Sequence, residues 1–325
     1  MRSALRRVGW ASFFLASALA ATCATAQGWK PAGPVRFIVP IQGGTVDILA
    51  RLAAPLLQER WGQPVVVEAK PGAGGNIGTD LVAKSAPDGQ TILVAFTAPI
   101  TVNATLFDKM PYDPLKDLAP ITLAVTTPQF FTVHPSVPAN SVSEFIAYAK
   151  KNPGKLSNGS SGNGTTGHLG GELFKAMTGI DIVHVPYKGS AQAINDLMSG
   201  TIQVMFDNVP SIGPHAKAGR VRGLGVSSPK RAAQFPDLPT IAEAVPGYET
   251  NSWGGVIGPA KLPKEIVSRL TDEIRKALAA PAVAERYRQL DTEPDGAGPE
   301  AFLELVRKET PKWAEVVKKS GAKVD

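Results

Sequence analysis

Two loops combine glycines with hydroxyl and amide side chains, and each stands between a predicted strand and a predicted helix. The first loop covers residues 40–47 (PIQGGTVD) and the second covers residues 158–168 (NGSSGNGTTGH). Glycines let the backbone approach a ligand closely, and the first-turn N–H groups of a helix favour an anion without any cationic side chain. The second loop can also supply several converging neutral donors. Both loops are therefore predicted to contact a negatively charged ligand.

Simpler structural roles are open for the same residues. Asp47 is predicted to cap the helix after the first loop, because aspartate is a preferred cap. The second loop is compatible with a flexible linker, but its place between a strand and an apolar helix favours binding. His168, at a helix start, is more typical of a structural hydrogen-bonding residue than of a catalyst. Asp207, at a predicted strand end, either caps the next helix or meets an amine or hydroxyl of a ligand.

Other chemistries find little support. Residues 70–78 (KPGAGGNIG) follow the second strand with the spacing G-x-G-G-x-x-G, which departs from a dinucleotide fingerprint and favours backbone packing. The serines at 160 and 161 do not satisfy G-x-S-x-G, because residue 163 is Asn. The four histidines have no paired ligand spacing. We therefore expect no catalytic residue, no metal site and no cofactor.

The charge balance is mild. The chain has 34 Lys and Arg against 28 Asp and Glu, a formal net charge of +6, and 7% aromatic residues. No run of basic residues resembles a nucleic-acid-binding stripe, so no nucleic acid partner is expected. A weakly positive field helps to collect anions without specifying any of them.

The first residues read as an export signal. Arg2, Arg6 and Arg7 precede an apolar stretch at 10–21 that is too short to span a bilayer, and an A-T-A pattern ends at Ala26. Cleavage after Ala26 would remove Cys23, the single cysteine, and leave a periplasmic protein of residues 27–325 without disulfides. The export route, general secretion or twin-arginine, stays open.

Short β-branched runs alternate with amphipathic helical stretches, which predicts an α/β protein with parallel, helix-covered sheets. The expected strands are 35–39, 65–67, 91–95, 156–158, 181–185, 202–206 and 222–226. The expected helices are 47–60, 76–85, 141–152, 168–177, 191–199, 263–279, 281–290 and 299–319. Extended stretches at 121–133 and 222–228 look like crossings between two lobes, with a ligand cleft between them. Lobe 1 would then contain 27–124 and 227–325, and lobe 2 would contain 125–226.

Five ordered segments resemble the Bug family, the periplasmic receptors of tripartite tricarboxylate transporters. They are 39–54 (VPIQGGTVDILARLAA), 67–93, 158–175, 184–189 (HVPYKG) and 205–208 (MFDN). The resemblance covers nearly the whole chain after the signal. It implies a two-lobed periplasmic-binding-protein fold (Venus flytrap, type II), a small carboxylate ligand held in the cleft, and membrane permease subunits as partners. We expect the receptor to be a monomer.

The resemblance also implies which residues contact the ligand. They are Gly43, Gly44 and Thr45 in the first loop, Ser160, Ser161, Gly164 and Thr165 in the second, and Asp207. Ile41 and Gln42 stand where the family usually has an aromatic residue and a small one, so this chain loses a stacking ring and gains a polar side chain. With His168 at the helix start, these eleven residues form the predicted binding site.

The sequence therefore predicts a periplasmic solute-binding receptor that captures a small carboxylate for a tripartite tricarboxylate-type transporter. An orphan sensor that feeds a membrane signalling receptor is the alternative, because it would use the same cleft and the same closure. An enzyme is less favoured, since neither a nucleotide fingerprint nor an activated nucleophile is present. The identity of the carboxylate stays open.

Overall fold

The computed structural model describes residues 29–232, 235–290, 292, 294–322 and 324, and Pro31–Asp325 forms one compact unit. The predicted signal peptide, residues 1–26, lies outside the described residues. Within the described ranges, no helix combines the length and the apolar character needed to cross a bilayer.

Nine strands of the described chain form the sheet. They are β1 (Val35–Val39), β2 (Val65–Ala69), β3 (Thr91–Phe96), β4 (Leu118–Val133), β5 (Ser157–Ser160), β6 (Val183–Pro186), β7 (Val204–Asn208), β8 (Arg222–Val226) and β9 (Asn251–Pro259).

Helices follow most of the strands. They are α1 (Thr45–Trp61), α2 (Asn76–Ala83), α3 (Asn103–Leu106), α4 (Val142–Lys151), α5 (Thr166–Thr178), α6 (Ser190–Ser199), α7 (Val209–Lys217), α8 (Lys264–Leu278), α9 (Pro281–Gln289) and α10 (Pro299–Ser320). Short irregular turns add η1 (Ala73–Gly75), η2 (Ala98–Val102) and η3 (Ile241–Glu243).

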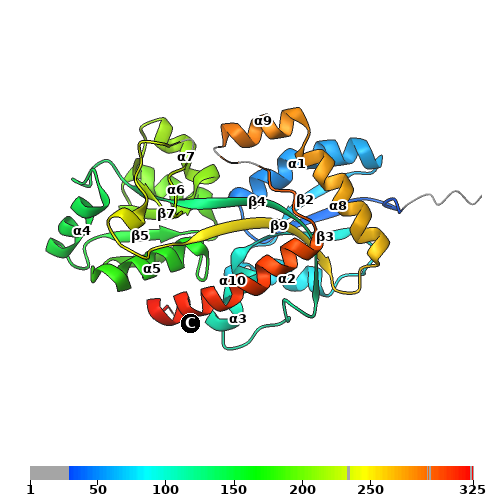
Figure 1. The fold of residues 1–325 in the computed structure, drawn as a ribbon, viewed down its shortest axis with the longest axis horizontal. Coiled ribbons are helices and arrows are strands. Elements are labelled where there is room, and N and C mark those ends of the chain that lie inside the picture. The colour runs from blue at the N-terminus through cyan, green and yellow to red at the C-terminus, as the bar shows by residue number, and fades with distance from the viewer. Residues whose placement is uncertain (1–28, 233–234, 291, 293, 323, 325) are drawn as a thin grey trace, which may run out of the picture. The chain divides into compact units, whose positions relative to one another are not determined.

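The sheet consists of two parallel groups joined by antiparallel strands. Its order is β2-β1-β3-β9-β4-β7-β5-β6, with β8 paired to β4. Strands β1, β2 and β3 are parallel, as are β5, β6 and β7, whereas β9 and β4 run antiparallel to each other and to their outer neighbours. Figure 1 shows β4 and β9 side by side between the two groups. Because parallel strands point the same way, each group gathers its strand carboxyl ends at one edge.

Two apolar clusters form the core. The first contains Ile38, Leu93, Trp253 and Phe302, and it packs β1, β3 and β9 against α10. The second is built on β7, β8, α6 and α7. Its buried members are Phe130, Ala193, Ile194, Leu197, Ile202, Met205, Val209, Ile212, Val221 and Val226. Ala232, Phe235 and Leu238 also pack against this second cluster.

Local signals fix several element ends. Gly62 ends α1 in the left-handed conformation at φ 65°, which only glycine adopts without cost. Ser141 caps α4 by accepting the Glu144 N–H at 3.1 Å. Pro281 and Pro299 begin α9 and α10, where the missing N–H costs nothing.

The predicted elements are largely confirmed, usually within a few residues at each end. The predicted parallel pairing is confirmed within each group of three strands, whereas β4 and β9, which join the two groups, are antiparallel. The crossing expected at 121–133 belongs to one 16-residue strand, β4. The stretch at 222–228 differs from its prediction. β8 pairs with the last residues of β4, Phe130–Val133, whereas the strand that accompanies β4 between the groups is β9.

Candidate functional site

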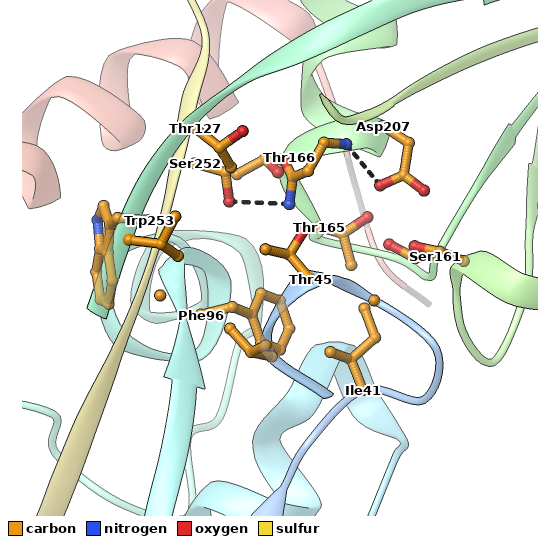
Figure 2. Close-up of a pocket in the computed structure, with 16 residues that line it drawn as sticks. Ile41, Thr45, Phe96, Thr127, Ser161, Thr165, Thr166, Asp207, Ser252 and Trp253 are labelled. Atoms are coloured by element: carbon orange, nitrogen blue, oxygen red, sulfur yellow. Dashed lines mark hydrogen bonds between the residues drawn. The ribbon is translucent and has the colours of Figure 1, made fainter. Parts of the chain in front are cut away.

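Four helices begin around one small cavity. α1 follows β1 through the loop at 40–44, α5 follows β5 through the loop at 161–165, and α6 follows β6 through residues 187–189. α7 follows β7 directly at Asn208. The first residues of α1, α5 and α6 line this cavity, as Figure 2 shows for α1 and α5, and so does Asn208, the cap of α7. The site therefore collects helix N-termini from both parallel groups of strands.

We call this space the inner cavity. Its wall combines apolar side chains with hydroxyls, one amide and one carboxylate. The lining residues are Ile41, Gly44, Thr45, Val46, Phe96, Val125, Thr127, Ser161, Thr165, Thr166, Ser190, Asp207, Asn208, Ser252, Trp253 and Gly254. The centre of a water molecule reaches a volume of about 20 Å³, which leaves room for about one water.

Helix N-termini contribute positive partial charge to the inner cavity. Backbone N–H groups in the first turn of a helix have no partner within the helix, and the helix dipole adds about half a positive charge at that end. Of the described residues that line the cavity, none is a lysine, arginine or histidine. Attraction for an anion therefore comes from aligned amides and hydroxyls.

The loop before α1 contributes unevenly. Ile41, Gly44 and Thr45 line the inner cavity, and the Thr45 hydroxyl lies 3.2 Å from that of Ser211. Gln42 instead pairs through its backbone with Gly189, in the loop before α6. This contact brings the two sides of the cavity together.

Gly43 is turned away from the cavity. It has φ 68°, and a Cβ there would lie 2.7 Å from the Cβ of Ala191. Its N–H donates to Asp47 Oδ2 at 2.9 Å. The helix cap is Gly44 rather than Asp47, so the predicted cap was wrong in position. Asp47 lies in the first turn and satisfies the Gly43 N–H, which is then unavailable to a ligand.

The loop before α5 divides in the same way. Ser161 and Thr165 line the inner cavity. Ser160 faces elsewhere, with its hydroxyl 2.7 Å from His184 Nε2. Gly164 has φ 80°, and its N–H donates to His168 Nδ1 at 3.0 Å.

His168 and His184 stack behind this loop with ring centroids 4.0 Å apart. Burial lowers the pKa of His168 to about 4 and that of His184 to about 3, and mutual repulsion adds to the effect at His184. Both rings are therefore neutral at pH 7. His168 is a structural hydrogen-bonding residue and does not line the inner cavity.

Asp207 is the one charged residue among the described residues that line the inner cavity. It is 5% exposed, and its Oδ1 accepts the Asn208 N–H at 2.8 Å. Its Oδ2 is buried without a hydrogen-bond partner in the described structure. Burial raises the pKa of Asp207 to about 6, against the opposing effects of the nearby Ser190 hydroxyl and the Asn208 N–H. Figure 2 shows Asp207 on the same side of the cavity as Ser161.

A second space, the outer cavity, adjoins the first. It shares Ile41, Phe96, Ser161 and Thr165 with the inner cavity and offers about 370 Å³ to the centre of a water molecule. Its other lining residues are Pro40, Pro71, Gly72, Ala73, Gly74, Gly75, Phe107, Gly162, Asn163, Pro186, Tyr187, Lys188 and Val324.

Comparison with known proteins identifies the family. The family model of the tripartite tricarboxylate transporter family receptor, TctC, matches residues 49–322. The chain belongs to the tripartite tricarboxylate transporter receptor family. A curated relative, BugT of Bordetella pertussis, is 36% identical over 314 residues, covering 96% of each chain.

Two solved receptors have the same fold. Rpa4515 of R. palustris, solved with adipate, has a TM-score of 0.87 and 39% identity over 90% of this chain and 99% of its own. MatC of Rhodopseudomonas palustris, solved with bound malate, has a TM-score of 0.84 and 29% identity over 88% of this chain and 99% of its own. The predicted α/β periplasmic-binding-protein fold is therefore confirmed, and the TctC family consists of solute-binding receptors rather than enzymes.

Several residues at this TctC receptor's inner cavity were missed from the sequence. They are Val46, Phe96, Val125, Thr127, Thr166, Ser190, Asn208, Ser252, Trp253 and Gly254. Ser190 had a usable signal, because Gly189 separates β6 from α6 in the same strand–glycine–helix pattern as the first loop. Ser252 and Trp253 had none, since they lie inside β9 and reach the cavity only through its pairing with β3 and β4.

The glycine-rich segment at 70–78 serves mainly packing. Asn76 Oδ1 accepts from Asn103 Nδ2 at 2.7 Å and from the Tyr112 hydroxyl at 2.9 Å. This buried network holds the segment beside the outer cavity. Among the described residues, no group of three or more His, Cys, Asp and Glu side chains is placed to hold a metal.

Proposed function

We propose that this TctC receptor binds a small organic acid through a carboxylate placed in the inner cavity. The observation that carries the proposal is the convergence of the N-termini of α1, α5, α6 and α7 on one cavity. Unpaired first-turn N–H groups and hydroxyls favour an anion in a small, water-poor space. Ser161, Thr165 and Thr45 are the proposed hydroxyl contacts.

The ligands of the solved relatives support this proposal. Rpa4515 was solved with adipate and MatC with malate, both of which are dicarboxylates. The differences at Ile41 and Gln42 leave the exact acid of the present receptor open to experiment.

We assign the rest of the ligand to the outer cavity. Phe96 and Phe107 give that space apolar surface, and Lys188, which is exposed, lies at its wall. An acid with an apolar or aromatic body, or with a second anionic group near Lys188, suits these surroundings. A carboxylate is larger than the one water that the inner cavity holds, so ligand entry requires the two sides to separate and close again.

We also infer the cellular setting. Members of the family are periplasmic binding proteins. Export with cleavage after Ala26, delivery to membrane permease subunits, and a monomeric receptor remain our proposals. So does the division into lobes 27–124 with 227–325 and 125–226. The two apolar clusters support this division for their buried members, which fall within 38–123 and 253–306 and within 130–226. The segment with Ala232, Phe235 and Leu238 is an exception, because it packs against the second cluster.

Ligand-dependent thermal unfolding tests the proposal. The purified receptor is titrated with dicarboxylates, tricarboxylates, aromatic acids and acidic amino acids, each beside its methyl ester. One site at about 100-fold excess over Kd should add about 2.7 kcal/mol to the unfolding free energy. Stabilisation by no acid, or equal stabilisation by acid and ester, would refute carboxylate binding.

A negative charge introduced into the wall of the inner cavity gives a second test of carboxylate binding. Ser161→Asp adds a carboxylate where the anion should lie, and we expect it to abolish binding. Ser143→Asp makes the same change in the exposed first turn of α4, remote from the cavity, and should leave binding intact. Retained binding by Ser161→Asp would contradict the assigned position of the anion.

A further inference from the structure

One buried oxygen at the inner cavity is left without a partner. Asp207 Oδ1 accepts the Asn208 N–H, but Oδ2 has no hydrogen-bond partner in the described structure although the residue is 5% exposed. The nearby Ser190 hydroxyl affects the pKa of Asp207, but it makes no hydrogen bond to Oδ2 in this geometry. Burying an acceptor unpaired is costly, and a carboxylate oxygen is among the most strongly hydrated of acceptors. Such a group in a ligand cavity indicates a missing donor.

A second acceptor faces the same space. Asn208 donates from Nδ2 to the Ser252 hydroxyl at 3.4 Å, while its Oδ1 is buried without a partner. Asn208 and Asp207 are consecutive at the carboxyl end of β7, and both line the inner cavity. Two adjacent unpaired acceptors therefore stand on one side of a space whose remaining polar wall consists of hydroxyls and helix N-termini.

The donors and the unpaired acceptors of the cavity wall suit two different groups of a ligand. Helix N-termini and hydroxyls suit an anion, as proposed above. A bare carboxylate against Asp207 would instead place two anions together in a poorly hydrated space. A hydroxyl or ammonium donates to Oδ2 and removes that conflict. Because Asp207 lies on the same side of the cavity as Ser161, the proposed carboxylate contact, this donor must lie close to the carboxylate.

We propose that Asp207 selects acids that carry a hydrogen-bond donor, either a hydroxyl or an ammonium, on the carbon next to the bound carboxylate. The inference rests on the proposed carboxylate site and narrows its substrate class to 2-hydroxy or 2-amino acids. Asp207 thereby determines specificity by pairing with the substituent rather than with the carboxylate.

Matched ligand series test this selection by calorimetry. Succinate, malate and aspartate share one carbon chain and differ only in the substituent, as do glutarate, 2-hydroxyglutarate and glutamate. Phenylacetate, mandelate and phenylglycine extend the series to an aromatic body. We expect the donor-bearing members of whichever series binds to bind at least about tenfold more tightly than the donor-free member, as for a lost hydrogen bond to a charged group.

Asp207→Asn then separates the two donors. The variant keeps an acceptor for the Asn208 N–H but loses the negative charge. An ammonium ligand should lose most of its advantage, whereas a hydroxyl ligand should keep part of it because an amide can pair with a hydroxyl. Asp181→Asn, an exposed aspartate away from both cavities, should leave every ratio unchanged.

The outcomes distinguish this inference from the function on which it rests. If donor-free acids bind as tightly as their substituted partners, a water satisfies Asp207 and the selection is refuted while carboxylate binding stands. Preference retained in full by Asp207→Asn refutes it equally. If no acid of any series binds, both the proposed function and this inference are refuted. The wild-type ratios decide the matter even if the variant folds poorly.

Discussion

Ser160 and Ser161 are neighbours in the chain, yet they serve opposite sides of the loop before α5. Ser160 belongs to a histidine side, where its hydroxyl lies 2.7 Å from His184 Nε2 and His168 accepts the Gly164 N–H. Ser161 belongs to a cavity side with Asp207, whose Oδ2 is unpaired. The histidine side is polar, buried and paired, while the cavity side is polar, buried and incomplete.

On our proposal, this difference separates groups that hold the fold from groups that contact a ligand. Buried polar atoms in folded proteins are almost always paired, so a paired group is explained by the structure alone and an orphaned one is not. The pKa values of the histidines and of Asp207 also shift in opposite directions. Burial favours the neutral form of both, which lowers the pKa of the histidines and raises that of Asp207.

The largest expected effect is acid destabilisation through the histidine side. Unfolded histidine has a pKa near 6.5, so the unfolded state binds more protons than the folded one as the pH falls from about 7 towards 4. Stability is complete above that range and should fall by about 2 kcal/mol for each histidine at pH 5. Protonated His168 Nδ1 would also oppose the Gly164 N–H as a second donor.

Urea unfolding between pH 7 and pH 5 measures this loss. His184→Gln keeps a partner for Ser160 but cannot titrate, so its stability should depend less steeply on pH than that of the wild type. Parallel pH dependences would show that the histidine pair is not the source.

The next largest effect concerns the stability of a variant on the cavity side. Asp207→Asn removes a buried charge, and we expect it to raise the unfolding free energy at pH 7 by up to about 3 kcal/mol. Because the folded pKa of Asp207 lies above its unfolded value, the wild type regains this stability as the pH falls from about 6 to below 4. The gain of the variant should vanish there. A variant less stable than the wild type at pH 7, measured beside Asp181→Asn, would make Asp207 a structural residue.

Ser160→Ala should have a moderate effect confined to stability. Removing the hydroxyl leaves His184 Nε2 without its partner, which should cost about 1–2 kcal/mol of unfolding free energy. Ligand affinity should stay within about twofold of the wild type, because Ser160 does not line the inner cavity. A large loss of affinity with unchanged stability would reverse the assignment.

Ser161→Ala should show the smallest and complementary effect. Its side chain lines the cavity and is only half-buried, so the unfolding free energy without ligand should change by less than about 0.5 kcal/mol. Affinity for the bound acid should fall by about 1 kcal/mol, or roughly fivefold, if the hydroxyl contacts the carboxylate. Calorimetry on both serine variants, with one ligand, checks the pair together.

Much of the local structure could be predicted from the sequence. The apolar spacing after Gly44, the left-handed glycine at 62 and the Ser141 cap each act within one helix, so α1 and α4 appeared close to their predicted bounds. The strand–glycine–helix pattern also directed attention to the loops at 40–47 and 158–168, whose residues Ile41, Gly44, Thr45, Ser161 and Thr165 do line the inner cavity.

The orientation within those loops could not be predicted. Gly43 and Gly44 have the same type and adjacent positions, but the left-handed φ of Gly43 turns its Cα towards Ala191 while Gly44 caps α1 at the cavity. Ser160 and Ser161 diverge because one ends β5 and the other begins the turn. Alternation along an extended strand sends neighbours to opposite faces, and a single sequence does not show which face meets the ligand.

The sequence by itself determined the secondary structure, the family and the kind of chemistry, because caps, periodicity and glycine turns depend on neighbours along the chain. Tertiary structure alone decided which polar groups are satisfied. Ser252 and Trp253 reach the cavity because β9 inserts between β3 and β4, and Asp207 Oδ2 is seen to lack a donor only once the residues around it are placed in space. Hydrogen-bond satisfaction is a property of atoms in space, so it appears only once the strands are paired.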